Sequence, residues 1–288
     1  MVKVKDFLDL LRVGQWYKNL MVFVPLIFSL KYITINLFIL NLLGFFALCF
    51  ISSSYYIIND VKDVEKDRHH PEKNKRPIVS GRISKGTAIL ISVLLFVDSL
   101  TLSWFLSPIF FLFVLGLFLS SQLYNFFLRE VAFFDIIIIS TNFIIRTVSA
   151  IFLLNIQLSY WIILCAFFLS IFLVSGKRIA ETEIKELQDY RKSLLKEHKQ
   201  TLNLMATISV AAVIIFFSIY SILTSQILLL ISLPISFYLI LLYFNGVYHH
   251  PEKIRNPEKF IFDKKIIISL ILWFILVVSA LYFSGNFF

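Results

Sequence analysis

The chain has 288 residues, of which 59% are apolar and 32 are Phe, and its mean hydropathy is +0.84. A soluble domain of this length does not carry so much apolar surface, so the composition excludes a soluble enzyme and predicts an integral membrane protein. Charged residues make up only 16% of the chain and are clustered, so the formal net charge of +9 indicates membrane topology and no nucleic-acid partner.

Residues 1–18 mix charged and apolar side chains at helical spacing, which predicts an amphipathic helix at the membrane interface. Nine apolar segments follow, each long enough to cross a bilayer. They run at about 19–36, 37–58, 86–104, 107–128, 131–153, 157–175, 201–222, 225–244 and 266–285. We therefore predict an all-α polytopic protein, a single domain over residues 1–288 with about nine transmembrane helices around a cytoplasm-facing cavity.

The basic residues divide unevenly between the two ends of these segments. Of the 27 Lys and Arg, only Lys31 and Arg146 lie outside one set of connections. That set comprises the N-terminal segment, the turn at Arg129, and the loops at about 59–85, 176–199 and 245–265. By the positive-inside rule, the N-terminus and these loops are predicted to be cytoplasmic, in the inner cell membrane.

A group of acids follows the second apolar segment. If the helix continues, Asn59, Asp63 and Asp67 stand at i, i+4 and i+8 on one face, with Asp60 beside them. Stacked like charges repel, so such a face usually holds a cation, and a hard ion such as Mg2+ takes oxygen ligands. The sequence therefore predicts a Mg2+ site here.

Bases follow these acids at once. Lys73 and Arg76 suit the phosphate oxygens of a metal-bound substrate. The alternative is a solvated helix end, in which Lys62 and Lys66 are the salt-bridge partners of the acids.

A second polar group lies where the fourth and fifth apolar segments meet. Asp135 falls about one turn inside the fifth segment, where an acid is costly unless it serves a cavity, a partner or a metal. We expect it to face the same cavity as the first acids. The alternative is an interfacial Tyr and Arg belt at Tyr124 and Arg129, with Arg129 paired to Glu130 or Asp135.

Two further features concern bases. Gly176-Lys177-Arg178 opens the third charged loop. Its bases could bind an anion, act as a topology signal or bind anionic lipid head groups. Asp98 and Arg146 lie at matching depth in their segments, which predicts a buried ion pair, with an acceptor phosphate as the alternative partner of Arg146.

The run from residue 59 to residue 81, NDVKDVEKDRHHPEKNKRPIVSG, resembles the first aspartate-rich motif of the UbiA superfamily of intramembrane prenyltransferases. Within that superfamily it is most similar to decaprenyl-phosphate phosphoribosyltransferases. Tyr124-x3-Leu128-Arg129-x5-Asp135 resembles the second motif, in which Lys is usual at the position of Arg129. Gly-Lys-Arg at 176–178, Gln-Trp-Tyr-Lys-Asn at 15–19 and Phe-Ile-Ile-Arg at 143–146 resemble the phosphoribosyltransferase members.

The resemblance implies a Mg2+-dependent enzyme that transfers 5-phosphoribose from 5-phosphoribosyl 1-diphosphate to a polyprenyl, decaprenyl-like phosphate and releases diphosphate. It implies metal ligands at Asn59, Asp63, Asp67 and Asp135, of which the three aspartates are catalytic. It implies substrate-binding roles for Gln15, Lys18, Asn19, Asp60, Arg68, Lys73, Arg76, Tyr124, Arg129, Arg146, Lys177 and Arg178.

Two alternatives remain open. One is a prenyltransferase of the same superfamily that uses a prenyl diphosphate and an aromatic acceptor, and the other is a transporter or non-catalytic membrane protein. A transporter favours charges along a path through the bilayer, whereas here the acids gather at one end of the spans. The length of the lipid and the oligomeric state leave no signature in the sequence.

Overall fold

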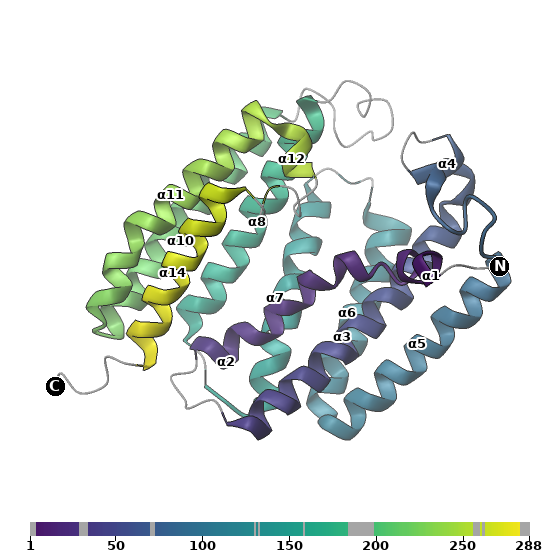
Figure 1. Cartoon of the computed structure of the whole chain (residues 1–288), viewed down its shortest axis with the longest axis horizontal. Coiled ribbons are helices and arrows are strands. Elements are labelled where there is room, and N and C mark those ends of the chain that lie inside the picture. The colour runs from purple at the N-terminus through teal and green to yellow at the C-terminus, as the bar shows by residue number, and fades with distance from the viewer. Residues whose placement is uncertain are drawn as a thin grey trace. The chain divides into compact units, whose positions relative to one another are not determined.

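The computed structural model describes residues 4–28, 34–69, 73–129, 131, 133–157, 159–183, 199–255, 260 and 263–282. Every regular element in these ranges is a helix, which confirms the all-α prediction (Figure 1). Eight of the described helices are long and apolar enough to cross a membrane. They are α3 (Ile35–Lys62), α5 (Lys85–Leu106), α6 (Pro108–Leu123) with its continuation η3 (Tyr124–Leu128), α7 (Phe134–Leu154), α8 (Tyr160–Glu183), α10 (Lys199–Leu223), α11 (Ile227–His249) and α14 (Lys264–Tyr282).

The chain divides into two compact units. One comprises Met1–Leu26, Ile33–Arg129 and Ile145–Gln157, and the other comprises Ile27–Tyr32, Glu130–Ile144 and Leu158–Phe288. α7 contributes its first half to the second unit and its second half to the first. The single domain over residues 1–288 stays a prediction.

The start of the chain differs from its prediction. α1 (Val4–Leu10) ends early because Arg12 takes a left-handed conformation with φ at 52°, so the amphipathic helix does not reach residue 18. A 3-10 helix, η1 (Val13–Phe23), and the short α2 (Val24–Phe28) follow. The predicted first span at about 19–36 is therefore not among the eight long helices, and residues 29–33 lie outside the described ranges.

η1 runs antiparallel to α3 in the first unit. Arg12 contacts Asp60 at one end of α3, whereas the Phe23 ring lies 6.2 and 5.9 Å from the rings of Phe38 and Phe45 near the other end. At about 1.5 Å per helical residue, this stretch of α3 is roughly 20–30 Å long. η1 therefore follows α3 over most of the depth of a bilayer's hydrocarbon core.

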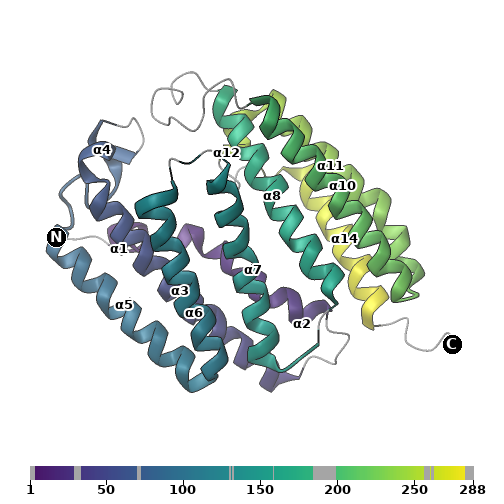
Figure 2. The same ribbon diagram turned by 180° about the vertical axis from the view of Figure 1, so that it is seen from behind.

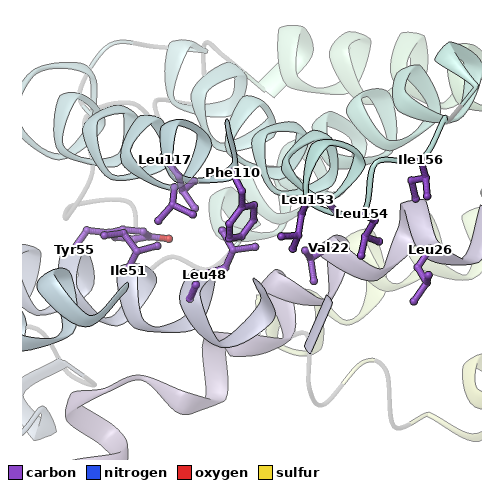
Figure 3. Close-up of a cluster of buried hydrophobic side chains, with 13 residues drawn as sticks. Val22, Leu26, Leu48, Ile51, Tyr55, Phe110, Leu117, Leu153, Leu154 and Ile156 are labelled. Atoms are coloured by element: carbon purple, nitrogen blue, oxygen red, sulfur yellow. The ribbon is translucent and has the colours of Figure 1, made fainter. Parts of the chain in front are cut away.

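The apolar core of the first unit lies between η1, α3, α6 and the end of α7, where Val22, Leu48, Phe110 and Leu153 meet (Figure 3). In a membrane, such packing depends on close contact and small residues, because lipid is as apolar as the side chains. Gly44 of α3 shows this directly, since a Cβ there would lie 2.5 Å from Leu153 Cδ2.

Serines join α5 to α3 in the same unit. Ser99 Oγ donates to Ala47 O at 2.7 Å, and Ser92 Oγ donates to Ser54 O at 3.0 Å. Buried hydroxyls of this kind let two helices approach and satisfy the donor within the membrane. The face of α5 that carries these serines is therefore fixed against α3.

In the second unit, α8 packs against α10, and α11 packs against both α10 and α14 (Figure 2). Gly176 of α8 allows a close approach by α11, because a Cβ there would lie 2.5 Å from Tyr243 Cε1. The Tyr243 hydroxyl donates to Leu173 O at 2.6 Å, so its ring is held in place. Gly176 thus allows α8 and α11 to pack closely at the position directly before Lys177 and Arg178.

We expect Gly176→Ala to destabilise the protein by about 1–3 kcal/mol, because the new methyl group overpacks the contact with Tyr243. Gly116→Ala is the matched control, since nothing lies within 4 Å of a Cβ at Gly116 in α6. It should stabilise slightly, by about 0.5–1 kcal/mol, because alanine favours a helix. Unfolding in detergent measures both, and equal effects would contradict the close contact.

Candidate active site

The acids predicted on one helical face share it in the structure. Asp63 N donates to Asn59 O at 2.9 Å, and Asp67 N donates to Asp63 O at 2.8 Å. Helical bonding therefore continues from α3 across Asp63 into α4 (Val64–Arg68), as predicted. Asp60, Asp63 and Asp67 are buried, with 4%, 8% and 1% of their surfaces exposed.

Arg76 bridges two of these acids. Its Nη1 lies 2.7 Å from Asp60 Oδ1 and 2.5 Å from Asp67 Oδ2. Lys73 Nζ lies 3.6 Å from Asp67 Oδ1. Burial lowers the pKa of both bases, and the opposing Asp67 charge only partly offsets it. The two residues predicted to bind substrate phosphates are thus already directed at the acids.

Arg12 is a site residue that the sequence analysis missed. Its Nε donates to Asp60 Oδ2 at 3.1 Å, its Nη2 pairs with Asp60 Oδ1, and its guanidinium lies 4.8 Å from the centre of the Tyr56 ring. Burial opposes the charge on Arg12, but Asp60, with smaller contributions from Tyr56 and Asp67, outweighs burial, so the pKa of Arg12 is raised. The contact spans 48 positions and depends on a left-handed backbone, so no local pattern reveals it.

Arg129 pairs with Asp63 and brings the second motif to the first. Neither predicted alternative partner of Arg129 is confirmed, because Asp135 pairs elsewhere and Glu130 lies outside the described residues. Arg129 directly follows η3, a single π-helical turn that begins at Tyr124. The Tyr124 side chain is half-buried. Turns of this kind are rare and often mark functional sites.

The solvated helix end is wrong as an account of these acids. They are buried and paired to Arg12, Arg76 and Arg129. Lys62 instead donates to a backbone carbonyl, and the side chain of Lys66 makes no hydrogen bond or ion pair within the described residues.

A second acid and base pair lies in the second unit. Arg178 Nε lies 3.0 Å from Asp135 Oδ2, and its Nη1 lies 2.7 Å from Glu181 Oε2. Asp135 and Arg178 are both buried, while the neighbouring Lys177 is half-buried. That Asp135 joins the acids of the first unit at one metal stays a prediction.

Arg146 belongs to a buried network, and its predicted ion pair with Asp98 is wrong. Its Nε donates to Asn19 Oδ1 at 2.7 Å and its Nη2 to the Tyr55 hydroxyl at 2.9 Å. Asp98 is exposed on α5 and makes no ion pair in the described part of the chain, because Ser99 and not Asp98 faces α3.

Three other predicted site residues take varied positions. Lys18 Nζ donates to the Tyr56 hydroxyl at 3.4 Å, beside the Arg12 guanidinium. Gln15 is half-buried on η1. Arg68 pairs with Glu65 at 3.0 Å, and 56% of its side chain is exposed, so the structure does not bring it to the acids.

The donors near Asn59 fit Mg2+ by type. Amide and carboxylate oxygens are the ligands this ion prefers, and Asn59 Oδ1 is buried without a hydrogen-bond partner in the described residues. Within the described ranges, however, no three His, Cys, Asp or Glu side chains group closely enough to hold a metal. Asp60, Asp63 and Asp67 pair instead with Arg12, Arg76 and Arg129, and a metal bound to these oxygens would have to replace those partners.

Residues 21–262 match the UbiA prenyltransferase family. The chain belongs to this family. Its fold is that of a UbiA homolog from Archaeoglobus fulgidus solved with GPP and Mg2+, with a TM-score of 0.69 at 19% identity over 96% of this chain and 99% of that one. The UbiA assignment makes the chain a multi-pass membrane transferase and excludes the transporter and non-catalytic alternatives.

Two curated relatives of this UbiA chain are named decaprenyl-phosphate phosphoribosyltransferase. The Mycolicibacterium smegmatis protein is 33% identical over 225 residues, which cover 76% of this chain and 70% of the relative. The Mycobacterium tuberculosis protein is 33% identical over 218 residues, which cover 73% and 72%.

Proposed function

We propose that this UbiA transferase moves 5-phosphoribose from 5-phosphoribosyl 1-diphosphate to a polyprenyl phosphate and releases diphosphate, with Mg2+ as cofactor. The names of the relatives support this activity. The structural observation that carries it is a surplus of cations at the acids of the first unit. Three buried carboxylates, Asp60, Asp63 and Asp67, meet four cations, Arg12, Lys73, Arg76 and Arg129.

This surplus favours a donor and an acceptor that carry several phosphates. A prenyl diphosphate brings one diphosphate, whereas the proposed donor adds a 5-phosphate and the proposed acceptor adds another phosphate. Bound Mg2+, held by Asn59, Asp63, Asp67 and, in this proposal, Asp135, would neutralise the leaving diphosphate. The four bases would then turn from the acids to the remaining phosphate oxygens.

The chemistry needs few protein groups. The bond between C1 of the ribose and the diphosphate oxygen breaks, and its electron pair leaves with the diphosphate. An oxygen of the acceptor phosphate forms the new bond to C1. Because this phosphate is already an anion, no side chain has to remove a proton, and the bases contribute by positioning and electrostatics.

We also propose that this reaction takes place at the cytoplasmic face. Arg12 contacts Asp60, so the basic N-terminal segment and the start of the basic loop at 59–85 lie at the same end of α3. Two basic segments at one end of a span agree with the positive-inside rule.

Ligand-dependent thermal stability tests the donor. With Mg2+ present, 5-phosphoribosyl 1-diphosphate at about 100 times its dissociation constant should stabilise the detergent-solubilised protein by about 2.7 kcal/mol. Ribose 5-phosphate should stabilise it less, because it lacks the diphosphate. The second candidate is a prenyl diphosphate donor, which the fold shared with the GPP-bound homolog favours. Stabilisation by geranyl diphosphate alone would overturn the proposed donor.

A further inference from the structure

Lys62 is a base beside the site to which the proposed reaction assigns no role. It is the last residue of α3 and immediately precedes Asp63. Its Nζ donates to Asn125 O at 2.6 Å and lies 4.3 Å from the centre of the Phe126 ring. An ammonium group that binds a carbonyl and lies over an aromatic face makes two favourable contacts with the same segment.

That segment is η3, the π-helical turn Tyr124–Leu128 that ends α6. A π turn closes its backbone hydrogen bonds from residue i to residue i+5, is rare, and occurs mostly as a single turn within an α-helix. Asn125 within it is buried, with 8% of its surface exposed, and the bond from Lys62 to its carbonyl is partly buried. Lys62 provides such a contact from another helix.

Arg129, the residue that follows η3, pairs with Asp63 of the first motif. Two consecutive residues of the first motif therefore contact the second motif. Lys62 donates to the Asn125 carbonyl, and Asp63 pairs with the Arg129 guanidinium. The backbone between Asn125 and Arg129 belongs to the π turn. The geometry of this turn therefore sets the position of the Arg129 Cα atom.

We infer that Lys62 is a positioning residue: its ammonium fixes the π turn at 124–128 and thereby directs Arg129 at Asp63. The inference rests on the proposed function insofar as Arg129 and Asp63 belong to the active site. If Asp63 holds the metal of the proposed reaction, it would release Arg129, and the Lys62 contact would keep the backbone at Arg129 in place. Lys62 itself does not need to touch substrate.

Hydrogen exchange of the substrate-free protein tests the first half of this inference. Lys62→Met removes the ammonium but keeps the length of the side chain, so backbone amides in a peptide covering 124–129 should exchange faster. Lys66→Met is the matched control, because Lys66 is exposed one turn further along and makes no side-chain hydrogen bond or ion pair in the described residues. Unchanged exchange at 124–129 in Lys62→Met would overturn the inference.

A double-mutant cycle tests the second half. Lys62→Met should lower kcat/KM by about 10–100-fold, the usual cost of losing a group that orients an active-site residue, and Lys62→Arg should restore most of it. In an Arg129→Gln background, Lys62→Met should cost much less, because the residue that it positions is gone. Equal losses in both backgrounds would show that Lys62 does not act through Arg129.

The two proposals fail separately. If the protein uses only a prenyl diphosphate, the proposed donor is wrong, and the cycle is run with that donor. The exchange experiment contains no substrate, so its result on Lys62 holds for either donor.

Discussion

Asp67→Asn is expected to lower kcat by about 10²–10³-fold, the usual cost of removing one group that stabilises charge in a transition state. Asp67 is the most buried of the three acids, and it contacts both Arg76 and Lys73. Asparagine keeps the shape and an acceptor oxygen for Arg76, which also retains Asp60 at 2.7 Å. The protein should therefore remain folded while it loses a carboxylate charge that we propose as a metal ligand.

Glu65→Gln is the matched control for this variant. Glu65 lies on the same short helix, α4, but 72% of its side chain is exposed and its ion-pair partners, Arg68 and Lys85, are themselves exposed. Its kcat should stay within about twofold of the parent, because exposed ion pairs contribute little. Steady-state rates with Mg2+, read beside melting curves, give the comparison. Near-parental turnover by Asp67→Asn would remove Asp67 from the reaction.

Arg146→Gln is expected to destabilise the protein by about 2–4 kcal/mol, because buried groups that lose a charged hydrogen-bond partner are left unsatisfied. Arg146 has 3% of its surface exposed and donates to both Asn19 and Tyr55. Asn19 and Tyr55 are themselves buried, with 1% and 5% of their surfaces exposed. Unfolding in a denaturing detergent, followed by tryptophan fluorescence, measures the loss.

Asp98→Asn provides the contrast. Asp98 is exposed on α5, so its substitution should change stability little, and adding it to Arg146→Gln should not restore stability. If the double variant were more stable than Arg146→Gln alone, Asp98 and Arg146 would form the ion pair that their matching depth in the membrane predicted.

Hydropathy and spacing predicted the helices and the shared face of the acids because both depend on local periodicity. Asn59, Asp63 and Asp67 keep their i, i+4 and i+8 register through two backbone hydrogen bonds. The first span was misplaced because η1 is a 3-10 helix and its start depends on the left-handed Arg12. Apolar composition does not distinguish these backbone geometries.

The contacts of the site could not be predicted, because they join residues far apart in the chain. Arg12 reaches Asp60 across 48 positions, and Arg129 reaches Asp63 across 66. The wrong pairing of Asp98 has a related cause: its depth was predicted, but the direction of its side chain around α5 was not. The buried serines at 92, 99 and 103 mark the face of α5 that packs inward, and Asp98 lies off that face.

Transfer of label from the donor to lipid tests the central claim most directly. Purified protein with Mg2+ and polyprenyl phosphate is given ribose-labelled 5-phosphoribosyl 1-diphosphate in one reaction and a labelled prenyl diphosphate in a parallel one. We expect ribose label in the organic-extractable lipid, with one diphosphate released for each ribose transferred, and both products formed about 10²–10³-fold more slowly by Asp67→Asn. Label that enters lipid only from the prenyl diphosphate would contradict the phosphoribosyl assignment.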